Sequence, residues 1–113
     1  MPFIKINTNV TINSNTLTEI KTELGSLIRS IPGKSEEWLM IDIDDKQTMF
    51  FKGVSEECAM IEVKLYGSAS SETLNNFTKR ITALISKLLN IQSARIYVSY
   101  YFTSNRGYNG SNF

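Results

Sequence analysis

The chain has 113 residues, with 12 basic and 11 acidic side chains and no histidine. This length fits a single domain over residues 1–113, and the near-neutral charge does not favour nucleic-acid or membrane binding. Without histidine, and with Cys58 as the one cysteine, neither an internal disulfide nor a usual Cys/His zinc site is available, and we expect no metal or other cofactor. Because histidine is absent, any acid-base catalysis must use a group other than an imidazole.

The first part of the chain predicts a strand followed by a helix. Residues 3–6 carry apolar side chains at Phe3, Ile4 and Ile6 and predict a strand, and the later stretch from Thr16 to Ile31 carries apolar side chains at helical spacing. Thr16 and Glu19 form a candidate capping box, and Pro32-Gly33 predicts the end of the helix. The opening segment has no apolar core of signal-peptide length, and no stretch of the chain is long enough to span a bilayer, so we expect a cytoplasmic location.

The second half of the chain repeats the first at an offset of 57 positions. A second helix is predicted from its apolar spacing, with Ser70 or Ser71 as the N-cap. The offset also aligns a strand at residues 39–43 with one at residues 96–100, so strand, helix and strand occur twice, over about residues 2–45 and 59–102. The matched helix positions are Leu17 and Leu74, Ile20 and Phe77, Leu24 and Ile81, Leu27 and Leu84, Ile28 and Ile85, and Ile31 and Leu88.

Each repeat should form a βαβ unit with parallel strands, because a helical crossover joins parallel neighbours. Two such units predict an α/β fold, α+β in some schemes, with a four-stranded mixed sheet and both helices on one face. Residues Met49 to Phe51 are a candidate for a short additional edge strand.

Alternation along the strands distinguishes the two faces of this sheet. The face opposite the helices is mixed, which favours cover by other copies of the chain and therefore a homo-oligomer. The helix-covered face should contain Ile4, Ile6, Leu39, Ile41, Ile43, Ile61, Val63, Leu65, Ile96, Val98 and Tyr100. The mixed face should contain Phe3, Lys5, Met40, Asp42, Met60, Glu62, Lys64 and Tyr97.

Five short motifs, in this order, resemble the macrophage migration inhibitory factor family of the tautomerase superfamily. They are Met1-Pro2-Phe3-Ile4-Lys5-Ile6-Asn7-Thr8-Asn9-Val10, Gly33-Lys34, Cys58-Ala59, Arg95-Ile96-Tyr97-Val98-Ser99-Tyr100-Tyr101 and Asn109-Gly110-Ser111-Asn112-Phe113. The resemblance implies a duplicated βαβ fold and a homotrimer whose sheets surround a central channel. It also implies that Pro2 is the catalytic residue.

A proline inside a chain is a tertiary amide, whereas a proline freed at the N-terminus is a secondary amine that can act as a base. The hypothesis therefore requires removal of Met1. A terminal amine of pKa about 8 is mostly protonated at pH 7, so an apolar pocket and a nearby cation are needed to lower its pKa.

The resemblance further assigns substrate binding to four residues and a pocket wall to six, some of them supplied by a neighbouring subunit. Without the resemblance, Lys34 would be interpreted as a surface residue at a helix end, and Trp38 and Tyr97 as packing aromatics. The substrate-binding residues are Lys34, Tyr66, Tyr97 and Ser99, and the pocket wall is Phe3, Trp38, Leu65, Arg106, Tyr108 and Phe113.

Four positions depart from the family pattern. Ser35 replaces a common proline, Tyr66 an isoleucine, Ser99 an asparagine and Arg106 an aliphatic residue. We expect a more polar and more cationic pocket mouth. Two interpretations of Arg106 stay open, a second carboxylate clamp and a solvent-facing side chain.

The implied function is a keto-enol tautomerase of the phenylpyruvate or dopachrome type acting on small aromatic or keto-acid substrates. The alternative is a secreted cytokine-like ligand of a host cell-surface receptor, exported by a route without a signal peptide, with vestigial tautomerase activity. A third hypothesis is an inert oligomeric scaffold with the same fold.

Overall fold

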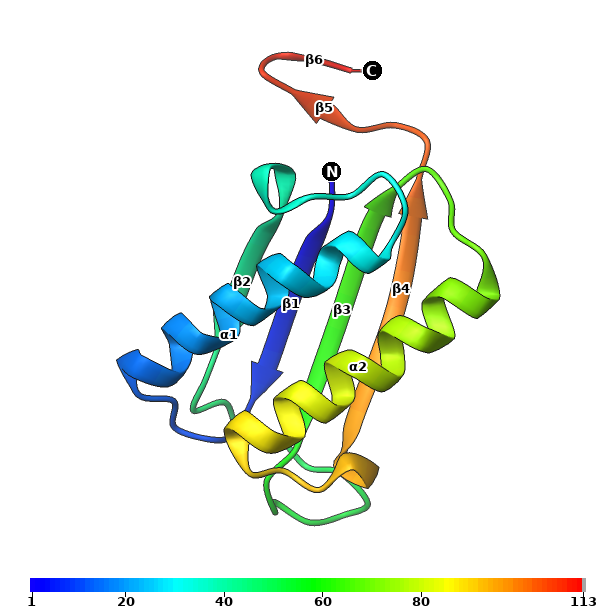
Figure 1. Ribbon diagram of the computed structural model, residues 1–113. Helices are drawn as coiled ribbons and strands as arrows, with labels where there is room; N and C mark the ends of the chain where they lie inside the picture. The colour runs from blue at the N-terminus through cyan, green and yellow to red at the C-terminus, as the bar shows by residue number, and fades with distance from the viewer. Residues whose placement is uncertain (113) are drawn as a thin grey trace.

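Four strands form one sheet in the computed structural model, which describes residues 1–112, and two long helices lie across one face of that sheet (Figure 1). The elements in chain order are β1 (Phe3–Thr8), α1 (Ser14–Leu27), η1 (Ile28–Ser30), η2 (Glu36–Trp38), β2 (Met40–Asp44), β3 (Ala59–Tyr66), α2 (Ser71–Leu89), η3 (Ser93–Arg95), β4 (Ile96–Thr103), β5 (Gly107–Tyr108) and β6 (Ser111–Asn112).

The strand order is β2-β1-β3-β4. β1 is parallel to β2 and β3 is parallel to β4, as two βαβ units require, and the two units meet through the antiparallel pair of β1 and β3. The predicted fold class, a mixed four-stranded sheet with both helices on one face, is confirmed.

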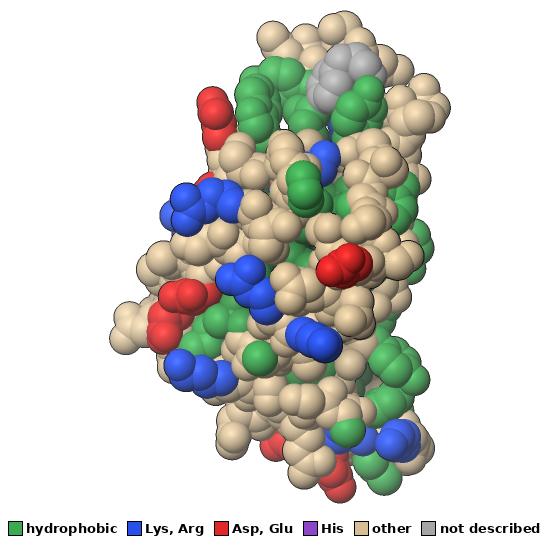
Figure 2. Space-filling model, turned by 45° about the vertical axis from the view of Figure 1, so that its right-hand side comes forward, with side chains coloured by type: hydrophobic (Ala, Val, Ile, Leu, Met, Phe, Trp, Pro, Cys, Tyr) green, Lys and Arg blue, Asp and Glu red, His purple; other side chains and the backbone are tan. Residues whose placement is uncertain are grey.

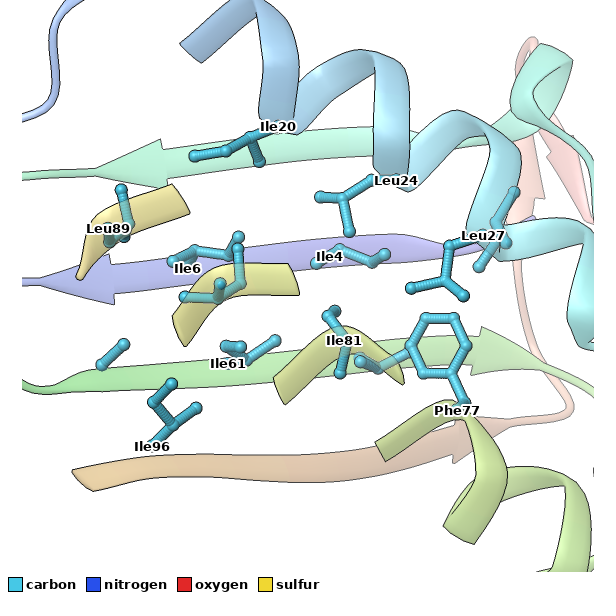
Figure 3. Close-up of a cluster of buried hydrophobic side chains, with 14 of the residues drawn as sticks. Ile4, Ile6, Ile20, Leu24, Leu27, Ile61, Phe77, Ile81, Leu89 and Ile96 are labelled. Carbon is cyan, nitrogen blue, oxygen red and sulfur yellow. The ribbon is translucent and has the colours of Figure 1, made fainter. Parts of the chain in front are cut away.

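The core lies between the sheet and the two helices (Figure 3). Burial alternates along β1 and β3, because successive side chains point to opposite faces of a sheet. Every residue predicted for the helix-covered face is buried or packs against the buried cluster. Phe77 of α2 is fully buried and is among the largest side chains of this core.

The start of α1 differs from the prediction. The N-cap is Asn13, whose side-chain oxygen accepts a hydrogen bond from the Thr16 backbone nitrogen at 2.8 Å. The predicted capping box of Thr16 and Glu19 is wrong, because Thr16 already lies inside the first helical turn. For α2, the predicted alternative Ser70 is confirmed as the cap, with its hydroxyl accepting from the Thr73 nitrogen at 3.1 Å.

The predicted edge strand at residues 49–51 is also wrong. Phe51 pairs only with Val54 in an isolated bridge, across a two-residue turn formed by Lys52 and Gly53. Both turn residues have positive φ, 54° and 79°, which is the conformation of a tight hairpin turn. The segment therefore folds back on itself instead of pairing with the sheet.

A small hairpin of β5 and β6 near the end of the chain was not predicted. Its turn is Asn109-Gly110, with φ of 51° and 88°. Asn-Gly is a strong hairpin signal, so the sequence did contain the information. The hairpin lies at the same end of the sheet as the N-terminus and η2 (Figure 1).

Within residues 1–112, neither of the long helices nor any shorter one combines the length and apolar character that a membrane crossing requires.

Candidate functional site

The N-terminus is held at the end of the sheet by the first backbone contact between β1 and β2. The carbonyl oxygen of Pro2 accepts a hydrogen bond from the Met40 nitrogen at 3.0 Å. Pro2 is buried and Met1 is half-buried. This hydrogen bond, made one residue before β1 begins, fixes the position of Pro2.

A turn after the first helix places Lys34 near this N-terminus. The Lys34 nitrogen donates to the Ile31 carbonyl at 3.1 Å, with Pro32 and Gly33 at the centre of the turn and Gly33 at a φ of 80°. The predicted role of Pro32-Gly33 as a stop is consistent with this turn, although α1 itself ends at Leu27. The Lys34 Nζ donates to the Tyr66 carbonyl oxygen at 2.7 Å, which fixes the ammonium beside the end of β3.

The short helix η2 brings Trp38 to the same end of the sheet. η2 lies close to α1 because Gly25 has no side chain, and an added Cβ there would collide with the Glu36 carboxylate. Lys21 of α1 forms an ion pair with Glu36 at 3.7 Å. The ring of Trp38 meets that of Tyr108 from β5 edge-to-face, with centroids 5.0 Å apart and planes at 90°.

These elements enclose a groove of about 410 Å³, which we call the N-terminal groove. Figure 2 shows hydrophobic side chains gathered at the upper end of the molecule, where Figure 1 shows the β5–β6 hairpin. The groove contains aromatic and aliphatic walls and two cations, Lys64 and Arg106, and no carboxylate of residues 1–112 lines it. Its lining residues are Met1, Pro2, Phe3, Trp38, Met40, Lys64, Arg106, Gly107 and Tyr108.

The electrostatics of the groove act on the N-terminal amine. Burial lowers the pKa of the Met1 amine below its usual value of 8.0, and the charges of Lys34 and Arg106 lower it further. Lys64, in contrast, has a nearby acid, with Glu62 at 3.9 Å, and its ammonium lies 5.8 Å from the ring centroid of Phe3. The Met1 N-terminal amine therefore has a larger neutral fraction at pH 7 than an exposed terminal amine has.

Five of the predicted site residues come together in this groove, and Lys34 lies beside it. Those lining the groove are Pro2, Phe3, Trp38, Arg106 and Tyr108.

Tyr97 and Ser99 lie elsewhere in the same chain, on the open face of β4. Tyr97 pairs with Met60 rather than with the residues opposite Phe3, so it lies about 13 Å along the strand from the groove. Its ring is 60% exposed and packs edge-to-face on Phe51 at 4.9 Å. A single chain therefore does not bring these two residues to Pro2.

The remaining predicted residues have different placements. Tyr66 reaches Lys34 through its backbone oxygen, whereas Leu65 is buried in the core beneath the helices, 1% exposed, and does not line the groove. Phe113 lies outside the described residues.

Met40 and Lys64 line the groove but were not among the predicted site residues. Both are register partners of Phe3, one on β2 and one on β3. The sequence had already assigned them to the open face, so the missing information was the pairing register.

The chemical character of the groove favours a small anionic ligand with an aromatic body. Aromatic walls bind an apolar ring, and the cations attract a carboxylate. Within residues 1–112, no three acidic or thiol side chains gather in a way that would hold a metal ion.

Comparison with known proteins gives one consistent assignment. The sequence model of the family described as "Macrophage migration inhibitory factor (MIF)" matches residues 1–113. Macrophage migration inhibitory factor of Xenopus laevis is 31% identical and that of Rattus norvegicus 30% identical, each over 100% of this chain and 99% of the relative. The crystal structure of Leishmania major MIF2 is similar, with a TM-score of 0.93 and 32% identity over 100% of this chain and 97% of that one. With the whole chain matched in both sequence and fold, this protein belongs to the macrophage migration inhibitory factor family.

Proposed function

We propose that the protein is a keto-enol tautomerase acting on small aromatic 2-keto acids of the phenylpyruvate type, with the nitrogen of Pro2 as the base. Removal of Met1 is part of the proposal, since it turns the Pro2 amide into a secondary amine. Family membership supports isomerase chemistry of this kind.

The observation that carries the proposal is the position of the N-terminus within an apolar, cationic groove. Met1 and Pro2 both line the groove, so loss of Met1 leaves the Pro2 nitrogen facing it. Burial and the two cations that lower the pKa of the Met1 amine would act in the same direction on a Pro2 amine. A base with its pKa near the working pH is the most effective.

In the proposed reaction, the neutral Pro2 nitrogen takes a proton from the carbon next to the ketone. The C–H bonding pair becomes the carbon-carbon double bond, and the carbonyl oxygen takes up the displaced pair. The Pro2 ammonium then returns its proton to that oxygen, which gives the enol and restores the neutral base, and ketonisation runs the same steps in reverse. The Lys34 ammonium would hold the substrate carboxylate. The rings of Trp38 and Tyr108 would contact the aromatic body.

We further propose that the active form is a homotrimer with its sheets around a central channel. The open face of the sheet supports an oligomer, because Met40 is 67% exposed and Tyr97 60% exposed on it. In such an assembly Tyr97 and Ser99 of one subunit would complete the groove of the next. This accounts for their distance from Pro2 within one chain.

The test is a ketonisation assay on protein whose intact mass shows that Met1 is absent. We expect Pro2→Gly to lower kcat by about 10²-fold or more, since a positioned base contributes on that order. A matched preparation that retains Met1 should be similarly inactive. Undiminished activity in either protein would contradict the role given to Pro2.

A second candidate function, a secreted ligand that binds a cell-surface receptor, is favoured by the family assignment itself. Its test is direct binding of the purified protein to receptor ectodomains. Binding that survives Pro2→Gly would separate this role from the tautomerase site, and no binding at micromolar concentration would count against it.

A further inference from the structure

Arg106 has no acidic partner within residues 1–112. The ion pairs in this part of the chain join Lys5 to Asp44, Lys21 to Glu36 and Lys64 to Glu62. The Arg106 guanidinium forms no side-chain hydrogen bond within residues 1–112. Yet its side chain is half-buried and lines the N-terminal groove. A guanidinium carries five N–H donors, which an enclosing site normally pairs.

Lys34, beside the groove, is the second cation that has no carboxylate partner within residues 1–112. Its Nζ donates to the Tyr66 backbone oxygen, and an ammonium has three donors. The charges of Lys34 and Arg106 both lower the pKa of the Met1 amine, so both charges lie near the N-terminus.

Apart from Lys64 and Arg106, the side chains that line the groove are apolar or aromatic. Trp38 and Tyr108 pack edge-to-face on one side, and the half-buried Phe3 lies at the start of β1. Within residues 1–112 no carboxylate lines the groove, and Lys64, the other cation in its lining, has Glu62 at 3.9 Å. Arg106 in the lining and Lys34 beside the groove are therefore two positive charges without a carboxylate partner in this part of the chain. A ligand with one negative charge would leave one of them uncompensated.

We propose that the groove selects a dianionic ligand, an aromatic 2-keto acid with a second carboxylate on its ring, and that Arg106 is the residue that holds this second carboxylate. Lys34 would take the carboxylate next to the ketone. The planar guanidinium suits a carboxylate because it can donate two parallel hydrogen bonds to its oxygens. The turnover of such a ligand rests on the proposed function, whereas its preferred binding does not.

The experiment compares phenylpyruvate with 4-carboxyphenylpyruvate as substrates of the Met-free protein. We expect kcat/KM to be about tenfold higher for the dicarboxylate, and Arg106→Gln to bring the ratio of the two kcat/KM values close to one. The ratio is the readout, because loss of this cation also changes the pKa of the base and so affects both substrates alike. Arg106→Lys should restore part of the preference, because it keeps the charge and loses the planar fork. Arg80→Gln, an equal charge change at an exposed position of α2, should leave the preference intact.

Equal kcat/KM for the two substrates in the unaltered protein would overturn the inference, as would an equal loss on both substrates in Arg106→Gln. A change of oligomer mass together with loss of the preference would assign Arg106 to a subunit contact and also overturn it.

A binding measurement separates this inference from the proposed function. Titration calorimetry with (4-carboxyphenyl)acetate and phenylacetate needs no turnover. If neither keto acid is ketonised, tighter binding of the dicarboxylate that depends on Arg106 still supports the dianion site, while the tautomerase proposal fails. Equal binding of the two acids overturns the dianion site whatever the activity.

Discussion

Arg95 and Arg106 lie at opposite ends of the sheet, and they differ in burial and in the hydrogen bonds of their guanidinium groups. Arg95, directly before β4, is 8% exposed, and its guanidinium donates to the carbonyl oxygens of Phe51, Val54, Glu56 and Glu57 at 2.9 to 3.3 Å. The guanidinium also lies over the Phe51 ring, 5.1 Å from its centroid. Arg106, at the end of the sheet where the N-terminus lies, is half-buried and lines the N-terminal groove.

The same contrast extends to the neighbours of each arginine. Near Arg95, Asn9 donates to the Ser55 and Glu56 carbonyls and accepts from the Cys58 nitrogen, so this end is cross-linked by side chains bonded to backbone. At the N-terminal end, the Lys34 Nζ has one backbone bond. A cation whose donors are used by backbone stabilises the fold, whereas one with unused donors beside a cavity is available to a ligand.

The largest effect should come from breaking the end of the sheet held by Arg95. Arg95→Met keeps much of the side-chain volume but leaves four carbonyl groups without their donor. We expect the free energy of unfolding to fall by about 3 kcal/mol, as for the loss of a largely buried charged group with several hydrogen bonds. Chemical denaturation measures this.

The matched control is Arg106→Met, which should change the free energy of unfolding by less than about 0.5 kcal/mol, because Arg106 has no ion pair within residues 1–112. Equal destabilisation by the two substitutions would remove the distinction drawn between the arginines.

A smaller effect is expected from Lys34→Met, and it should appear in the pH profile. Burial is the first cause of the lowered pKa of the Met1 amine and Lys34 the second, and we expect both to act in the same direction on the Pro2 amine. Removal of the lysine should therefore raise the pKa of the Pro2 amine. The neutral, reactive fraction of the amine then falls at a given pH. The acid limb of kcat/KM should shift to higher pH, so the loss in the variant should be larger at pH 6 than at pH 8, on top of a pH-independent loss from the missing carboxylate contact.

Lys64→Met serves as the control for this profile, because Lys64 lines the groove but has Glu62 as its partner. Its acid limb should keep its position. A limb that moves equally in both variants would show that general groove charge, and not Lys34, sets the pKa.

The smallest effect concerns the loop between β1 and α1, which contains the N-cap Asn13. Asn13→Ala removes the N-cap of α1 and should lower the free energy of unfolding by about 1 kcal/mol. Thr16→Ala, at the position that the sequence wrongly indicated as the cap, should cost less than half of this. Thermal unfolding of the two variants measures the difference, and a larger loss from Thr16→Ala would contradict the cap assignment.

Local pattern was sufficient for the fold because it was repeated and periodic. The helix spacing of residues such as Ile20 and Phe77, and the alternation along β1 and β3, identified two βαβ units and the covered face of the sheet. The prediction failed at short features. The observed cap, Asn13, lies three residues before the predicted Thr16, and both residue types can cap a helix. The apolar run at residues 49–51 resembles a strand whether or not it has a partner.

For the site, the sequence alone determined the kinds of group present, namely a proline at position 2, cations at 34 and 106, and aromatics at 38 and 108. Only the tertiary structure decided which of them meet. Pro2, Trp38 and Arg106 are far apart in the chain and come together through strand register, a glycine that lets η2 approach α1, and the turn before Lys34. Register also separated Tyr97 from the groove, since Phe3 is in register with Tyr101 through Lys64, four residues along β4 from Tyr97. Side-chain proximity across a sheet depends on pairing between distant segments, and that is a property of the folded chain as a whole.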